Sequence, residues 1–231
     1  MKRLLIHVEG QTEETFVSDV LRDYLVDRGF HDVNARLIGD PRKKRGGIQA
    51  WHVVRKDILN HLKEDRNCYV TTMVDFYGLP QSGDKAWPKR AEASEVPFSE
   101  RSDTVQEALL ADITTGYGGD FHPVRFIPFV IMHEFEGLLF SDPDRFAEGI
   151  ARKDLTDKFT TILKQFNSPE EINDTPSGHP SQRIRDLIPG YQKPLLGVLA
   201  ALEIGVDTMR EKCRNFNNWL TNLESLPELD T

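Results

Sequence analysis

Cysteine is scarce in this sequence. Its 231 residues include only Cys68 and Cys213, and neither has a second Cys or a His at the spacing of a zinc site. Two cysteines so far apart do not form the disulfide framework of a small secreted domain. This usage favours a cytoplasmic protein that has no structural zinc and no disulfide scaffold.

Long apolar runs are also missing. The apolar stretch at the N-terminus meets Glu9 too early to form the hydrophobic part of a signal peptide. The other long apolar stretch, residues 194–206, contains Glu203 and falls short of the roughly 20 residues that a bilayer-spanning helix needs. We therefore expect a soluble protein with no membrane partner.

Positive charge is in deficit, with 29 Lys and Arg against 37 Asp and Glu and a net charge of -8. This balance argues against a protein held on nucleic acid or an anionic membrane by bulk positive charge. It is compatible with a nucleic-acid enzyme, because carboxylates can hold divalent cations that reverse the local charge where a phosphate binds. At 39% hydrophobic residues, the chain can build one sizeable core.

Several common catalytic motifs are absent. The sequence has no Walker lysine loop, no GxGxxG, no GxSxG and no HExxH. These absences remove the commonest nucleotide-binding, serine-hydrolase and zinc-protease interpretations.

Strands and helices alternate in the first 140 residues. Hydrophobic periodicity predicts strands at 4–8, 33–38, 69–74 and 124–132, and helices at about 12–28, 48–62 and 104–113. The proline-rich stretch 78–101 is predicted to be a long loop. Such alternation is typical of βαβ units with right-handed crossovers, so we expect an α/β fold with a mainly parallel sheet.

The remainder of the chain is predicted to be helical. Helices are expected at 143–149, 156–166, 182–187, 194–204 and 208–223. The sequence thus predicts an α/β core over residues 1–140. A helical C-terminal extension over residues 141–231 would pack on it as one structural unit.

Carboxylates follow three of the four predicted strands. Glu9 follows the first strand, Asp75 the third, and Glu134 with Glu136 the fourth. Ligands of parallel sheets bind outside the carboxyl ends of the strands, so we expect these groups to converge, together with Glu13 in the first turn of the next helix. Gathered carboxylates repel one another unless a cation lies among them, and Mg²⁺ or Mn²⁺ takes such oxygen ligands. This pattern predicts a metal site suited to phosphoryl transfer.

Each of these residues also has a purely structural interpretation. Glu9 and Glu13 are also typical of a helix N-terminus, where acids are favoured electrostatically. Asp75 is also typical of a turn after a strand. Glu134 and Glu136 share one face only if their segment is extended, and they could lie on a solvated edge strand.

Two basic segments are candidates for phosphate contacts. Arg42, Lys43, Lys44 and Arg45 lie in a glycine-flanked loop and could bind a nucleic-acid backbone or simply be solvated. Arg183 and Lys193 lie in a polar-then-helical region together with Ser181. From there a cation could stabilise charge that develops on a phosphate.

The sequence resembles an uncharacterised bacterial family that has a Toprim-like fold and is distantly similar to the Toprim domain of the OLD (overcoming lysogenization defect) nucleases. The resemblance spans nearly the whole chain. The residues that carry it are 8–13, 74–78, 133–140 and 204–219.

The resemblance implies roles for the acidic residues. Toprim domains hold Mg²⁺ with an acid after the first strand and an Asp-x-Asp pair after a later strand. By that resemblance Glu9 takes the first role, Glu13 matches the acid four residues later, and Asp75 matches the first Asp of the pair. Tyr77 stands where the second Asp would be. The metal site is then altered, or it is completed from elsewhere.

Three further residues match the nuclease branch of that family. Glu134 and Glu136 resemble its additional acidic motif and could complete the metal site in place of the missing Asp. Lys193 resembles a basic residue late in the domain. The resemblance thus implies a Mg²⁺ (or Mn²⁺) site of Glu9, Glu13, Asp75, Glu134 and Glu136, with Glu9, Asp75 and Lys193 as catalytic residues.

The function implied by the resemblance is Mg²⁺-dependent cleavage of DNA or RNA. It would serve phage defence in the cytoplasm, beside an ABC- or SMC-type ATPase. The alternative is a non-catalytic regulatory or assembly subunit that lost efficient chemistry with the second Asp. A third hypothesis is phosphatase or nucleotidyl-transfer chemistry on a small nucleotide. The sequence leaves the oligomeric state open, a homo-oligomer included.

Overall fold

A parallel β-sheet forms the centre of the protein in the computed structural model, which describes residues 2–39, 47–172 and 178–226. The strands are β1 (Arg3–Val8), β2 (Asp32–Leu37), β3 (Cys68–Asp75), β4 (Phe126–Ile127) and β5 (Val130–Ile131). The order is β2-β1-β3-β4, with β5 also paired to β3, and all pairs are parallel. The sheet confirms the predicted α/β class.

The predicted fourth strand is split into β4 and β5. Pro128 lies between them and has no backbone N–H to donate. The Thr72 hydroxyl instead accepts from the Phe129 N–H and donates to the Phe129 carbonyl, each at 2.9 Å. This side chain replaces the backbone ladder at the break, so both short strands still follow β3.

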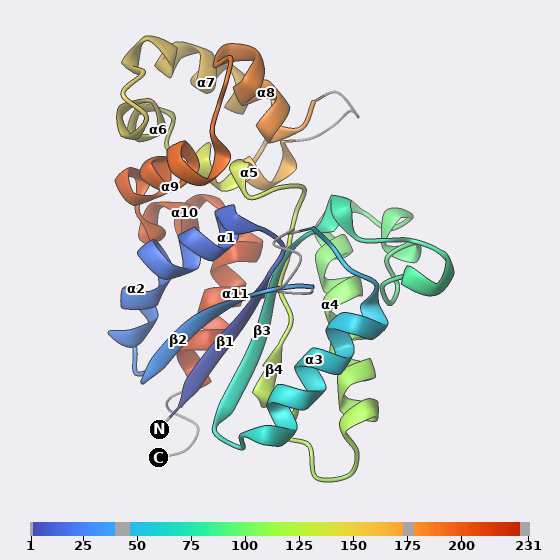
Figure 1. The fold of residues 1–231 in the computed structure, drawn as a ribbon. Helices are drawn as coiled ribbons and strands as arrows, with labels where there is room; N and C mark the ends of the chain where they lie inside the picture. The colour runs from blue at the N-terminus through green and yellow to red at the C-terminus, as the bar shows by residue number, and fades with distance from the viewer. Residues whose placement is uncertain (1, 40–46, 173–177, 227–231) are drawn as a thin grey trace.

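Helices cover both faces of the sheet (Figure 1). One face carries α3 (Trp51–Glu64) and α4 (Phe98–Tyr117), which share an apolar cluster with β3. The other face carries a continuous helical segment and the C-terminal helix α11 (Arg214–Ser225). That helical segment comprises α1 (Gln11–Phe16), a π-helical turn and α2 (Arg22–Val26).

The chain after β5 is helical, as predicted. It forms α5 (Glu136–Leu139), α6 (Pro143–Gly149), α7 (Thr156–Leu163), α8 (Pro180–Leu187), α9 (Lys193–Ile204), α10 (Val206–Lys212) and α11. Figure 1 shows α5 to α9 beyond the carboxyl ends of the strands. None of the described helices is long and apolar enough to cross a membrane.

One helix prediction was wrong. The single helix expected over 208–223 is two helices, because the backbone leaves helical geometry at Cys213 (φ −119°, ψ 97°). The break lets α11 lie against the sheet, where the Trp219 indole N–H donates to the Thr71 hydroxyl at 2.9 Å. The division of the chain at residue 140 stays a prediction.

Candidate functional site

Glu9 and Glu13 lie at the carboxyl end of β1. Gly10 is extended (φ −144°, ψ −179°) and α1 begins at the next residue, so only one residue separates Glu9 from the helix. A Cβ at Gly10 would lie 3.1 Å from Glu13 Oε2. The absence of a side chain at residue 10 therefore allows the buried Glu13 carboxylate to fold back towards the strand end.

Asp75 ends β3, the strand next to β1, so it lies beside Glu9. A Cβ at Gly78 would lie 3.4 Å from Glu9 Oε2, which shows how closely the segment after β3 covers that carboxylate. The first two predicted groups of acids therefore do meet at one edge of the sheet.

Glu134 and Glu136 follow β5, but not in an extended segment. His133 has a left-handed backbone (φ 69°) and Glu136 opens the short helix α5. The Glu134 carboxylate accepts the Ser181 N–H at 2.9 Å and the Ser181 hydroxyl at 3.0 Å. The Glu136 side chain is 1% exposed.

The Lys193 ammonium lies near the carboxylates of both Glu134 and Glu136. Its Nζ lies 3.0 Å from Glu136 Oε2 and 3.9 Å from Glu134 Oε1. Burial opposes the charged form of this lysine, yet Glu136 and Glu134 raise its pKa above the ordinary value. The first residue of α9 thus places one ammonium group among the carboxylates.

The other four acids lie close enough to Asp75 to raise its pKa, so we treat all five as one group, the carboxylate cluster. Burial raises the pKa of Asp75 well above its usual value, and four carboxylates raise it further. These four are Glu13, Glu9, Glu136 and Glu134. Burial is also the main reason why the pKa values of Glu9, Glu13 and Glu136 are raised.

Three oxygens of the carboxylate cluster receive no hydrogen bond from the part of the chain that the structure describes. They are the buried atoms Glu9 Oε2, Asp75 Oδ1 and Glu136 Oε1. Unpaired buried carboxylate oxygens are costly, and a hard divalent cation takes such oxygens as ligands. Among the described residues, however, no three His, Cys, Asp or Glu side chains are arranged to hold a metal ion. The donor chemistry fits Mg²⁺ or Mn²⁺, and binding would require these side chains to move.

The model of one protein family matches most of the chain. This family is a domain of unknown function, DUF4276, and the match covers residues 8–224. The chain belongs to the DUF4276 family. No curated protein and no solved structure matches the chain. The matched range contains every member of the carboxylate cluster, so the DUF4276 domain itself includes the candidate site.

Sequence reasoning missed Tyr191. Its buried hydroxyl has no hydrogen-bond partner among the residues whose structure is described, and burial, followed by Glu136, raises its pKa. A Cβ at Gly197 would lie 3.2 Å from this hydroxyl, so glycine leaves room for it. No local sequence pattern indicates that Tyr191 lies near Glu136, because Tyr191 is in a loop between α8 and α9.

The other predicted basic residues lie apart from these contacts or cannot be placed. Arg42, Lys43, Lys44 and Arg45 fall outside the described residues. Arg183 donates to the Gly178 carbonyl at 2.8 Å, and its guanidinium lies 5.2 Å from the Phe166 ring centre. These contacts anchor Arg183 within the extension.

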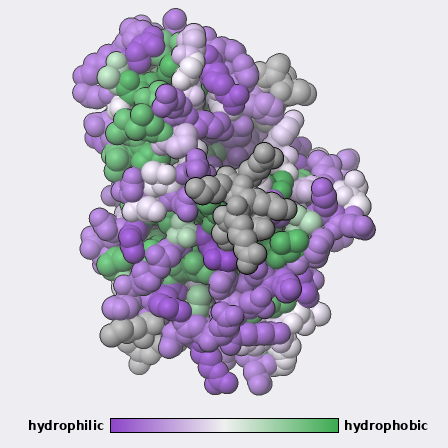
Figure 2. Space-filling model, in the orientation of Figure 1, coloured by the Kyte–Doolittle hydropathy of each residue, from purple (hydrophilic) through white to green (hydrophobic). Residues whose placement is uncertain are grey.

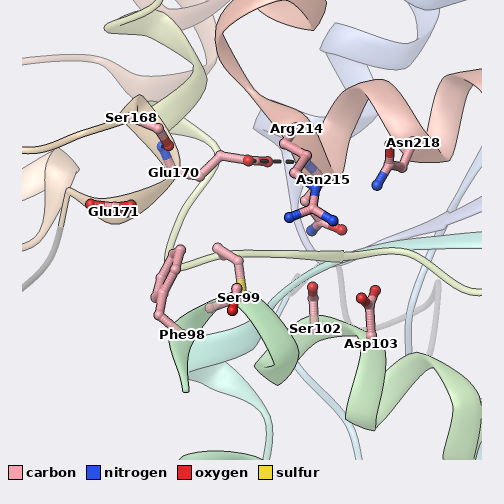
Figure 3. Close-up of a pocket in the computed structure, with 11 residues that line it drawn as sticks. Phe98, Ser99, Ser102, Asp103, Ser168, Glu170, Glu171, Arg214, Asn215 and Asn218 are labelled. Carbon is pink, nitrogen blue, oxygen red and sulfur yellow. Dashed lines mark hydrogen bonds between the residues drawn. The ribbon is translucent and has the colours of Figure 1, made fainter. Parts of the chain in front are cut away.

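A separate cavity of about 200 Å³ lies between the starts of α4 and α11 (Figure 3). It contains none of the predicted site residues. Its buried acid, Glu170, accepts the Asn215 N–H at 3.0 Å and the Phe216 N–H at 3.1 Å. Glu170 therefore caps α11, which is a structural role.

Proposed function

We propose that this DUF4276 protein is a nuclease that hydrolyses phosphodiesters of DNA or RNA with Mg²⁺ or Mn²⁺. The observation that carries the proposal is the carboxylate cluster with its three unpaired buried oxygens at the carboxyl ends of parallel strands. Structural acids are normally paired, whereas Glu9, Asp75 and Glu136 each leave one buried oxygen unpaired among the described residues, at the usual ligand position of such sheets.

The acids of the carboxylate cluster, Lys193 and Ser181 would have different roles in the reaction. Glu9, Glu13, Asp75, Glu134 and Glu136 would hold the cation, which supplies charge neutralisation and water activation when bound. Lys193 would stabilise negative charge on the phosphate, because its ammonium already lies among the acids. Ser181 would orient Glu134 through its two hydrogen bonds.

The resemblance to Toprim nucleases of the OLD type supports the same activity. Glu9 follows β1 and Asp75 ends the adjacent parallel strand β3, an order of acids like that of the Toprim family. On this basis we propose a cytoplasmic role in phage defence beside an ABC- or SMC-type ATPase partner. Arg42, Lys43, Lys44 and Arg45 remain proposed contacts to the nucleic-acid backbone.

The second candidate function is a regulatory or assembly subunit without efficient chemistry. Two observations favour it. Tyr77 replaces the second Asp, and no ligand trio is ready among the residues that the structure describes. In that case Lys193 would serve as a permanent counter-ion that replaces the metal.

A cleavage assay with Mg²⁺ on labelled DNA and RNA tests the proposed nuclease. We expect Glu9→Gln to lower the rate by at least about 100-fold, because the cation that activates water would lose a carboxylate ligand. Asp75→Asn should be similarly impaired. The matched control is Glu64→Gln, which removes an exposed acid at the opposite edge of the sheet.

Equal cleavage by the wild type and by the Glu9 and Asp75 variants would contradict the proposal. Calorimetric titration with Mn²⁺ separates the two candidate functions. If the protein is a nuclease, the wild type should bind Mn²⁺ and the Asp75→Asn variant should not. A wild type that binds no Mn²⁺ would favour the regulatory subunit.

A further inference from the structure

An aromatic group lies at the edge of the carboxylate cluster. The Tyr77 ring makes an edge contact with His179, with 4.8 Å between ring centres, and lies 6.2 Å from His133. His133 in turn lies 5.6 Å from Phe98. We call these four residues the aromatic platform.

The platform and the carboxylate cluster are built from the same segments. Tyr77 lies two residues after Asp75 and directly before Gly78, which packs on Glu9. His133 directly precedes Glu134. His179 lies two residues before Ser181, whose N–H and hydroxyl bind Glu134. A ligand that contacts Tyr77 would therefore lie beside the carboxylate cluster.

The Tyr77 ring is both exposed and supported. The residue is 47% exposed, and it is the only aromatic one among the large apolar side chains that the described chain leaves exposed. Next to it, His133 is buried and has a left-handed backbone, which non-glycine residues adopt infrequently. Residues in sparsely populated backbone conformations cluster at active sites and ligand clamps.

We propose that the aromatic platform stacks an unpaired base of a nucleic-acid strand whose phosphate enters the carboxylate cluster. This inference rests on the proposed function and deepens it, because it names single-stranded nucleic acid as the preferred substrate. Every base has a π-face that an aromatic ring can stack on, whereas bases within a duplex are already stacked. The Tyr77 ring would then stack on a base, at the position where the resemblance to Toprim nucleases implies an Asp.

Fluorescence anisotropy with a labelled oligonucleotide tests the platform. Binding is measured in Ca²⁺ for a single strand and for the duplex of the same sequence, in separate DNA and RNA arms. Tyr77→Leu should weaken single-strand binding about 10-fold, within the range for loss of one stacked base, and leave duplex binding unchanged. Tyr77→Phe and Tyr77→Trp should retain the wild-type affinity.

The matched control is Tyr117→Leu, which makes the same replacement at the end of α4, at the opposite edge of the sheet. It should bind single strands as the wild type does. A second readout places 2-aminopurine in the strand. Its fluorescence should change on binding to the wild type and not on binding to Tyr77→Leu.

Three outcomes would overturn the inference. They are wild-type single-strand affinity in Tyr77→Leu, equal losses for single strand and duplex, and no strand binding by the wild type. Failure of the proposed function looks different. A wild type that binds single strands through Tyr77 without cleaving them would overturn the nuclease and support the platform.

Discussion

At the scale of single residues, Asp75 lies in an unusual electrostatic environment. Its Oδ1 atom is buried and receives no hydrogen bond from the described residues, and burial together with four other carboxylates raises the pKa of Asp75. A raised carboxyl pKa means that the folded protein binds a proton more tightly than the unfolded chain does. Stability is therefore lost as the pH rises above the ordinary aspartate value of 3.8 towards the raised value.

Asp75→Asn should stabilise the protein at neutral pH, because the amide removes a buried charge from a repulsive cluster. We expect the Tm to rise by about 2–4 °C, which corresponds to about 1 kcal/mol in a chain of this size. The gain should shrink as the pH falls, because the wild-type carboxyl takes up its proton more readily than an ordinary aspartate does. Thermal melts over a series of pH values measure it, and a lower Tm at neutral pH would refute this account.

At the scale of elements, α11 depends on a cap from outside its own sequence. The helix has no side-chain cap at Cys213. The Glu170 carboxylate, 45 residues earlier in the chain, accepts the Asn215 N–H and also the next N–H along the helix. The contact ties the turn at Pro169–Glu171 to the start of α11, as Figure 3 shows.

Glu170→Gln should destabilise the protein by about 1–2 kcal/mol, because one of the two accepting oxygens becomes a donor that faces an N–H. Urea unfolding followed by circular dichroism measures the change. The neighbouring Glu171→Gln is the control, since Glu171 accepts its hydrogen bonds within the described residues from the exposed Asn167. Equal losses in the two variants would contradict the capping role.

At the scale of the whole molecule, the C-terminal helix supplies part of the core of the sheet. Trp219 is 3% exposed and stacks on Phe129, with 4.3 Å between ring centres and 5° between ring planes. On the opposite face of the sheet, Trp51 and Trp87 pack together at 5.0 Å. The tryptophans thus report on both faces of the same sheet.

We expect the core and the extension to unfold in one transition. In Trp219→Phe, the fluorescence of Trp51 and Trp87 should show the same urea midpoint as far-ultraviolet circular dichroism. Trp219→Ala should shift both midpoints together and cost about 3–5 kcal/mol. Two separate midpoints would mean that residues 1–140 and 141–231 are independent domains.

The sequence by itself determined the α/β class and the places of Glu9 and Asp75. Local periodicity reveals where strands end, and the carboxyl ends of parallel strands share one edge of a sheet. It did not locate the break at Cys213. A break in a helical pattern depends on how the following helix packs against the sheet.

Only the tertiary structure decided what surrounds those acids. Lys193 meets Glu136 across 57 residues, and Ser181 meets Glu134 across 47. Contacts at such separations come from the docking of α8 and α9 over the strand ends, which periodicity does not encode. The same docking brings His179 against Tyr77, so an exposed ring lies beside the carboxylate cluster.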